Sequence, residues 1–197
     1  MLSLRFCAAG CGRPAYEGSS LCATHSADPQ ADAIKLGGYI RQQKIINDLC
    51  VQGLHFHEMD FSRCQFYSSD FAGASFSNCL FNNSVMRMSF FEFTIFSSCD
   101  LSSSDMQFIS FAGSTIKDCS FEGSELVNIN FGGTLISDSS FSKTNLYKSR
   151  FVSANILRSD FIDCNLNRTN FVKATRENTS FKSSNTAEAI FEMEEYN

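Results

Sequence analysis

Three cysteines and a histidine near the N-terminus have the spacing of a metal-binding site, Cys7-x3-Cys11-x10-Cys22-x2-His25. Thiolate sulfur and imidazole nitrogen are the ligands of tetrahedral structural Zn²⁺ sites, and each close pair can contact the same ion. Four protein ligands leave no open coordination position, so the pattern predicts structural rather than catalytic Zn²⁺. The alternative is a flexible tail with incidental cysteines.

These four residues belong to an N-terminal module, residues 1–27, that must be positioned by its neighbours. A segment of this length cannot build a hydrophobic core, so bound metal must supply its folding energy. The module is similar to small zinc-ribbon or zinc-knuckle modules. Asp28 and Pro29 are suited to the N-cap and first turn of a helix. A helical cap is therefore expected over 28–48, unless Gly37-Gly38 interrupts it.

A repeat of five residues dominates the rest of the chain. Every fifth residue from Val51 to Phe171 is apolar, which gives 25 positions, 15 of them Phe. From Cys64 to Thr169, the residue two places earlier is Ala, Cys, Ser or Thr at 20 of 22 positions. Residues two apart point the same way in an extended chain. A period of five therefore predicts short extended pieces joined by turns and wound into a coil.

The repeat unit is a small residue, Asp or Asn, a large apolar residue, and two variable residues in Ser69-Asp-Phe-Ala-Gly73, Ala154-Asn-Ile-Leu-Arg158 and Cys164-Asn-Leu-Asn-Arg168. These units resemble the pentapeptide-repeat family over about 49–183. The resemblance implies an all-β fold, a right-handed quadrilateral β-helix with four units per coil. Many units lack the Asp or Asn.

Residues 20 apart should then stack, and one such column is entirely Phe: Phe71, Phe91, Phe111, Phe131, Phe151 and Phe171. Five cysteines fall in the small, inward series: Cys64, Cys79, Cys99, Cys119 and Cys164. Free cysteine is commonly buried, so we interpret them as core residues. A redox or metal ladder along Cys79, Cys99 and Cys119 is the alternative.

Both ends of a coil stack expose core and need caps. Ile34, Ile40, Ile45 and Leu49 are expected to cover the first coil. At the other end, Asn185 and Glu188 resemble a capping box, which predicts a helix over 186–196 that buries Ile190 and Phe191. The segment 184–197 is expected to cap the rod or to join two copies. The family resemblance makes a homodimer through this end plausible.

Several functional classes are disfavoured by composition. The net charge of −5 argues against direct nucleic-acid binding, and no apolar run is long enough to span a membrane. The first residues lack the apolar core of a secretory signal, so a cytoplasmic location is expected. No catalytic constellation or phosphate loop is present, and we expect neither enzymatic activity nor a small-molecule substrate. His55 and His57 are expected to be ordinary surface residues.

The surface most suited to a partner lies in one coil, where apolar residues fill outward positions. These residues are Leu80, Val85, Met88, Phe90, Phe93 and Ile95, with Phe108 one coil beyond Met88. Large exposed apolar patches usually mark interaction sites. We therefore predict a protein-interaction scaffold that presents a rigid surface to a protein partner. The open alternatives are a local departure from the repeat or cover by the N-terminal module.

DNA mimicry is a second hypothesis, because quinolone-resistance proteins of this family bind DNA gyrase and topoisomerase IV in place of the duplex. Residues 51–125 contain 9 acidic and 3 basic residues, whereas residues 126–175 contain 3 acidic and 6 basic residues. A rod of ~30 Å would need roughly 18 negative charges to match duplex DNA. The rod is therefore acidic in its first part only.

Overall fold

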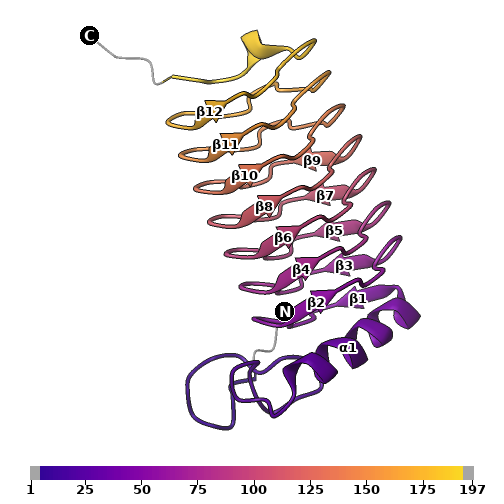
Figure 1. The fold of residues 1–197 in the computed structure, drawn as a ribbon. Coiled ribbons are helices and arrows are strands. Elements are labelled where there is room, and N and C mark those ends of the chain that lie inside the picture. The colour runs from indigo at the N-terminus through magenta and orange to yellow at the C-terminus, as the bar shows by residue number, and fades with distance from the viewer. Residues whose placement is uncertain (1–4, 193–197) are drawn as a thin grey trace.

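The computed structural model describes residues 5–192, and Figure 1 shows a rod of stacked coils above one helix and a loop-rich N-terminal segment. The rod is a parallel β-solenoid of about 7 turns, which confirms the predicted fold class. Strand partners are 20 residues apart: Ile45 pairs with Gln65, and Gln65 pairs with Val85. Each coil therefore contains four pentapeptide units, one per side.

Two sides of the rod are regular sheets among the described residues. The first has five parallel strands: β1 (Ile45–Asn47), β3 (Gln65–Tyr67), β5 (Val85–Arg87), β7 (Asp105–Gln107) and β9 (Glu125–Val127). The second has seven: β2 (His55–His57), β4 (Ser75–Ser77), β6 (Ile95–Ser97), β8 (Thr115–Lys117), β10 (Leu135–Ser137), β11 (Asn155–Leu157) and β12 (Thr175–Glu177).

The other two sides are held by single bridges between coils. One, here named the Phe91 face, consists of residues 50–53 and each segment 20 residues further on, up to 170–173. Its bridges join Asp70 to Phe90 and Phe90 to Ser110. The opposite side, the Leu101 face, consists of residues 60–63 and the equivalent segments up to 180–183, and its bridges join Asp60 to Leu80.

The corners explain why the unit has five residues. Every fifth residue from Asp48 to Ser183 has a positive φ, between 46° and 71°. A single left-handed residue turns the chain from one side to the next. Glycine adopts this conformation freely, and Asn or Asp adopts it at modest cost. Five of the corners are glycine, for example Gly73 and Gly113.

The interior is a set of ladders of like side chains. Phe111 is fully buried, and its ring centroid lies 5.2 Å from those of Phe91 and Phe131. The small inward residues bond to carbonyls of the preceding coil, as when Ser104 Oγ donates to the Phe81 carbonyl at 2.8 Å. The ladders combine apolar burial with satisfied polar groups.

The inward cysteines behave as core residues. Cys79, Cys99 and Cys119 are at most 3% exposed. The neighbouring Cys119 thiol raises the pKa of Cys99 to about 12, so Cys99 stays protonated at neutral pH. Its thiol donates to the Phe76 carbonyl at 3.4 Å, in the manner of the serines in the same series.

The helix α1 (Pro29–Gln43) covers the first coil and begins as predicted, with Asp28 Oδ1 accepting from the Ala31 amide at 3.0 Å. It runs through Gly37-Gly38 without interruption and ends at Gln43 rather than 48, because Lys44 is left-handed with φ 59°. The solenoid therefore begins at Ile45, not 49.

The buried face of α1 also differs from the expected one. Ala33, Leu36 and Ile40 are buried, whereas Ile34 and Ile45 are 55% and 57% exposed. Ile34 lies on the outer side of the helix, and Ile45 occupies an outward slot of β1. Of the four residues predicted to cover the first coil, only Ile40 and Leu49 are therefore buried.

The expected C-terminal helix is not formed in the described residues. A short 3₁₀ helix, η1 (Thr186–Glu188), is followed by extended chain in which Ile190 pairs with Asn170. The Phe191 ring stacks 5.2 Å from that of Phe171, so the period of 20 resumes. Asn185 makes no cap; its Oδ1 accepts from the Leu166 amide at 2.6 Å instead. Residues 193–196 of the expected helix lie outside the described residues.

Within residues 5–192, no helix combines the length and apolar character that crossing a bilayer requires.

Candidate metal centre and interaction surface

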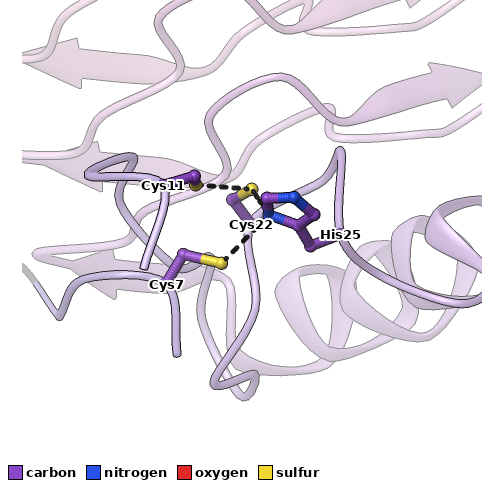
Figure 2. A group of neighbouring side chains, drawn as sticks. All are labelled: Cys7, Cys11, Cys22 and His25. Carbon is purple, nitrogen blue, oxygen red and sulfur yellow. Dashed lines mark hydrogen bonds between the residues drawn. The ribbon is translucent and has the colours of Figure 1, made fainter. Parts of the chain in front are cut away.

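Two tight turns present the four predicted metal ligands. In the first, the Gly10 amide donates to the Cys7 carbonyl at 2.9 Å, and Gly10 and Gly12 have φ of 74° and 73°. A Cβ at either position would be strained, so glycine permits this turn. In the second, the His25 amide donates to the Cys22 carbonyl at 3.0 Å. The two turns face each other (Figure 2).

The side-chain geometry fits a tetrahedral ion. The ligand atoms of Cys7, Cys11, Cys22 and His25 all lie within 4.8 Å of one another. The Cys11 and Cys22 sulfurs are 3.8 Å apart, and His25 Nδ1 lies 3.5 Å from the sulfurs of Cys7 and Cys22. A tetrahedron with Zn–S of about 2.3 Å and Zn–N of about 2.05 Å has edges of roughly 3.8 Å and 3.6 Å. The cluster is compatible with Zn²⁺.

Local hydrogen bonds also favour the thiolate form that a metal requires. A hydrogen bond from the Cys22 backbone lowers the pKa of Cys7 to about 6, against the raising effect of burial. Hydrogen bonds to Cys7 and Cys22 raise the pKa of His25. The Cys7 sulfur therefore carries negative charge next to the imidazole near neutral pH. At Cys11, a hydrogen bond from the Arg13 backbone lowers the pKa, but burial and the neighbouring thiols outweigh it and raise the pKa overall.

The N-terminal module occupies the place of a coil that would precede the first one. The Glu17 amide donates at 2.7 Å to the Cys50 carbonyl, the type of bond that joins one coil to the next. Tyr16 is 4% exposed and belongs to the core cluster, and its hydroxyl bonds to Asp32 of α1. The cluster of ligands is thus fixed to the end of the solenoid.

The seven residues predicted as an interface do not form one patch. Phe90 lies on the Phe91 face, and the corners bordering that face hold Met88, Phe108 and Phe93, with Ile95 just beyond. In contrast, Leu80 lies on the opposite Leu101 face, and Val85 is half-buried in β5. The prediction failed for these two because one coil passes around all four sides of the rod.

Five residues, here named the apolar surface, therefore remain together: Met88, Phe90, Phe93, Ile95 and Phe108. Their exposed fractions are 56%, 46%, 72%, 51% and 61%. Leu135, 53% exposed, lies two coils beyond Ile95 in the same column of the second sheet and was not predicted. An apolar residue at an outward position that is usually polar is the sequence signal that could have revealed Leu135.

Three residues of the apolar surface also have an unfavourable backbone conformation. Met88, Phe93 and Phe108 stand at corners with φ of 53°, 56° and 56°. Bulky side chains are rare in the left-handed region because Cβ is crowded there. Local conflicts between residue and backbone are expected at functional sites. Exposure and backbone conflict therefore point to the same residues.

The remainder of the Phe91 face is flat and almost uncharged. Its outward slots hold Ala72, Ala112 and Gly132, and four of its corners are glycine. The Phe93 ring lies over Gly113, where an added Cβ would approach it to 2.6 Å. Small residues and low charge allow another surface to approach closely.

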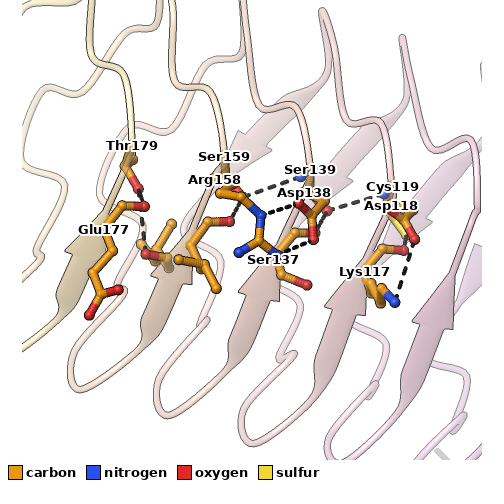
Figure 3. Close-up of polar contacts among 12 residues, drawn as sticks. Lys117, Asp118, Cys119, Ser137, Asp138, Ser139, Arg158, Ser159, Glu177 and Thr179 are labelled. Carbon is orange, nitrogen blue, oxygen red and sulfur yellow. Dashed lines mark hydrogen bonds and ion pairs between the residues drawn. The ribbon is translucent and has the colours of Figure 1, made fainter.

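An acidic groove of about 520 Å³ lies along the other side of the rod, where the second sheet meets the Leu101 face. Its acidic lining residues are Asp100, Asp118, Asp138 and Asp160. Figure 3 shows Arg158 reaching Asp138 one coil away, with Nε to Oδ1 at 2.6 Å and Nη2 to Oδ2 at 2.7 Å. This ion pair lowers the pKa of Asp138 and neutralises part of the groove.

The histidines of the first coil are exposed, as predicted. His55 and His57 Nδ1 lie 2.5 Å and 2.8 Å from the hydroxyls of Ser75 and Ser77 in the next coil. Among the described residues, the N-terminal cluster is the one group of three or more ligand-type side chains close enough to share an ion.

Comparison with known families agrees with this architecture. Profiles described as "Pentapeptide repeats (8 copies)" match residues 52–83, 60–97 and 94–133, and one described as "Pentapeptide repeat region" matches residues 114–191. The chain belongs to the pentapeptide-repeat family. The matches begin after the N-terminal module, so the family assignment concerns the solenoid.

Solved pentapeptide-repeat structures are similar to the chain at low identity. HetL of the cyanobacterium Nostoc, a protein involved in heterocyst differentiation regulation, is 10% identical over 79% of this chain and 94% of its own, with a TM-score of 0.38. Rfr23 of Cyanothece is 13% identical over 80% and 99%, with a TM-score of 0.34. The plasmid-mediated fluoroquinolone resistance protein QnrB1 is 22% identical over 68% and 73%, with a TM-score of 0.29. No curated protein matches the sequence.

Proposed function

We propose that this protein is a non-enzymatic interaction scaffold that binds a protein partner through its apolar surface. The observation that carries this proposal is the coincidence of exposure and backbone conflict at Met88, Phe93 and Phe108. A side chain that is both exposed and unfavourable on its backbone contributes little to stability. Its retention is explained by contact with another molecule.

The size of the apolar surface supports the same conclusion. Large side chains expose roughly 200 Å² when free, so the measured fractions correspond to about 550 Å² for the five residues. The largest apolar patch on a typical monomer is about 300–600 Å² and is often functional. This surface alone is at the upper end of that range.

A quantitative capture experiment tests the proposal. Tagged protein is incubated with lysate of its native cell, and bound proteins are measured for the wild type and for Phe90→Ser/Phe93→Ser. We expect the variant to lose the specific partner and to melt at nearly the same temperature. Leu80→Ser removes an exposed apolar residue from the opposite face and should retain the partner. Equal capture by all three proteins, or unfolding of the double variant, would contradict the proposal.

The proposal for the N-terminal cluster is a structural Zn²⁺ held by Cys7, Cys11, Cys22 and His25. Its support is the match between the sulfur and nitrogen separations and tetrahedral edges. Purified protein should contain about one Zn²⁺ per chain, and Cys22→Ser should lose it. Ser20→Ala, a change in the same module outside the ligand set, should retain it. Metal-free protein with an intact N-terminal module would contradict this assignment.

DNA mimicry is the second candidate, and the acidic groove favours it. Asp100, Asp118, Asp138 and Asp160 follow one edge of the rod, as phosphates follow a strand. The Arg158 ion pair and the basic second half of the rod weaken the likeness. A gyrase supercoiling assay distinguishes the two candidate functions. A DNA mimic inhibits or protects the enzyme, and the Asp100→Asn/Asp118→Asn variant should lose this effect. A scaffold that uses the apolar surface leaves gyrase activity unchanged.

A further inference from the structure

Charge is distributed unevenly along the axis of the rod. Because each coil adds 20 residues along the axis, residues 51–125 form one half and residues 126–175 most of the other. The first carries 9 acidic and 3 basic residues, and the second carries 3 acidic and 6 basic residues. Two copies side by side in the same direction would repel, whereas two copies in opposite directions would attract.

The Phe91 face repeats this polarity within its own few charges. Its partly exposed acidic residue, Glu92, lies in the coil of Phe91, whereas Asp70 in the coil of Phe71 is buried and accepts a hydrogen bond from the Gln52 side-chain amide. The basic residues Arg150 and Lys173 lie in the coils of Phe151 and Phe171. Between them, the coils of Phe111 and Phe131 present small and uncharged side chains. The face therefore carries one partly exposed acidic residue toward one end, two basic residues toward the other, and a flat middle.

We propose that the Phe91 face binds a second copy of this chain in antiparallel orientation, with a two-fold axis crossing between the coils of Phe111 and Phe131. The inference rests on the proposed function, since it takes this face as a protein interface, and it names the partner. A two-fold axis there brings the coil of Phe91 opposite the coil of Phe151 in the other copy, and the reverse.

The side chains that meet across this axis are complementary. Phe90 and Arg150 occupy the same outward slot three coils apart, so each Phe90 ring faces a guanidinium of the second copy, a cation–π arrangement. Glu92, on the same coil as Phe90, lies within reach of that guanidinium. In the middle, Ala112 and Gly132 face their counterparts with little side chain between them.

The available area agrees with a stable dimer. A standard interface buries about 800 Å² on each partner, and the apolar surface supplies about 550 Å² of exposed side chain. The flat residues from the coil of Phe71 to that of Phe171 extend the contact along the face.

Sedimentation equilibrium and light scattering on the full chain test the inference at about 50 mM salt. We expect a dimer at low micromolar concentration. Ala112→Arg places a large charge at the centre of the contact and should weaken dimerisation at least about tenfold. Ser102→Arg is the matched control, because it introduces the same residue in the same slot on the opposite face. It should leave the dimer intact.

A charge exchange tests the orientation, and it remains informative if Ala112→Arg fails to fold. Glu92→Arg and Arg150→Glu should each weaken the dimer about tenfold, and the double variant should restore it to within about threefold of the wild type. A protein that stays monomeric at about 100 µM overturns the inference. A dimer that survives Ala112→Arg, or singles that the double variant fails to rescue, also overturns it. The capture experiment needs no dimer, so a monomeric protein that still binds its partner through Phe90 and Phe93 leaves the proposed function standing.

Discussion

Replacing Phe111 by alanine is the most direct test of the ladder as the source of stability. The side chain is fully buried, and its ring is stacked between those of Phe91 and Phe131, with centroids at 5.2 Å on both sides. Loss of buried apolar area contributes about 2–3 kcal/mol, and two aromatic neighbours add about 0.5–1.5 kcal/mol each. These terms add to about 3–6 kcal/mol. We expect a loss of about 3–5 kcal/mol, because that is the range for Phe→Ala in a core that does not collapse.

The assay is equilibrium unfolding in guanidinium, followed by circular dichroism. The control is Phe93→Ala, the same change at a residue 72% exposed in the neighbouring coil, which should alter stability by less than about 0.5 kcal/mol or raise it. If Phe111→Ala loses less than about 1 kcal/mol, or if both variants lose the same amount, the ladder is not the main source of stability.

Three further predictions concern the corners, the metal and the thiols. Phe108→Asn should raise the free energy of unfolding by about 1 kcal/mol in thermal unfolding, because Asn adopts the φ of 56° more readily, and it should weaken partner binding. Asn128→Phe, in the same column of corners, should lower the free energy of unfolding. No change in either variant would refute the argument from backbone conflict. Chelation of Zn²⁺ should speed hydrogen exchange in β1 and β2 but not in β10 or β11, since the N-terminal module bonds to Cys50; uniform change would contradict this. Cys99 should resist thiol reagents at pH 8 in the native protein, because burial and a pKa of about 12 keep it protonated, and rapid modification would show an open coil.

The fold and the ligand set could be predicted from the sequence because both depend on spacing. A unit of five, with like residues recurring every 20, fixes which side chains stack regardless of the surroundings. The confirmed register of Phe71, Phe91 and Phe111 follows from it. Cys7, Cys11, Cys22 and His25 were predicted as a set because close pairs of ligands need only a local turn to meet.

The ends of the rod were predicted less well, because the five-residue repeat does not extend unbroken into them. Helix α1 stops at Lys44 when pairing of Ile46 with Phe66 becomes more favourable than another turn of helix. At the C-terminus, stacking of Phe191 on Phe171 prevails over the local helical signal of Asn185 and Glu188. In both places a contact 20 residues away prevails over local preference.

The sequence by itself determined the period, the inward and outward slots and the grouping of Cys7, Cys11, Cys22 and His25, since each is a matter of order along the chain. Only the tertiary structure decided which outward residues share a face. Leu80 and Phe90 are close in sequence but lie on opposite sides of the rod, whereas Met88 and Phe108 are a full coil apart in sequence and adjacent on one corner. Proximity on the surface depends on how the coil closes, and that closure is set by left-handed corners whose conformation no single residue type dictates.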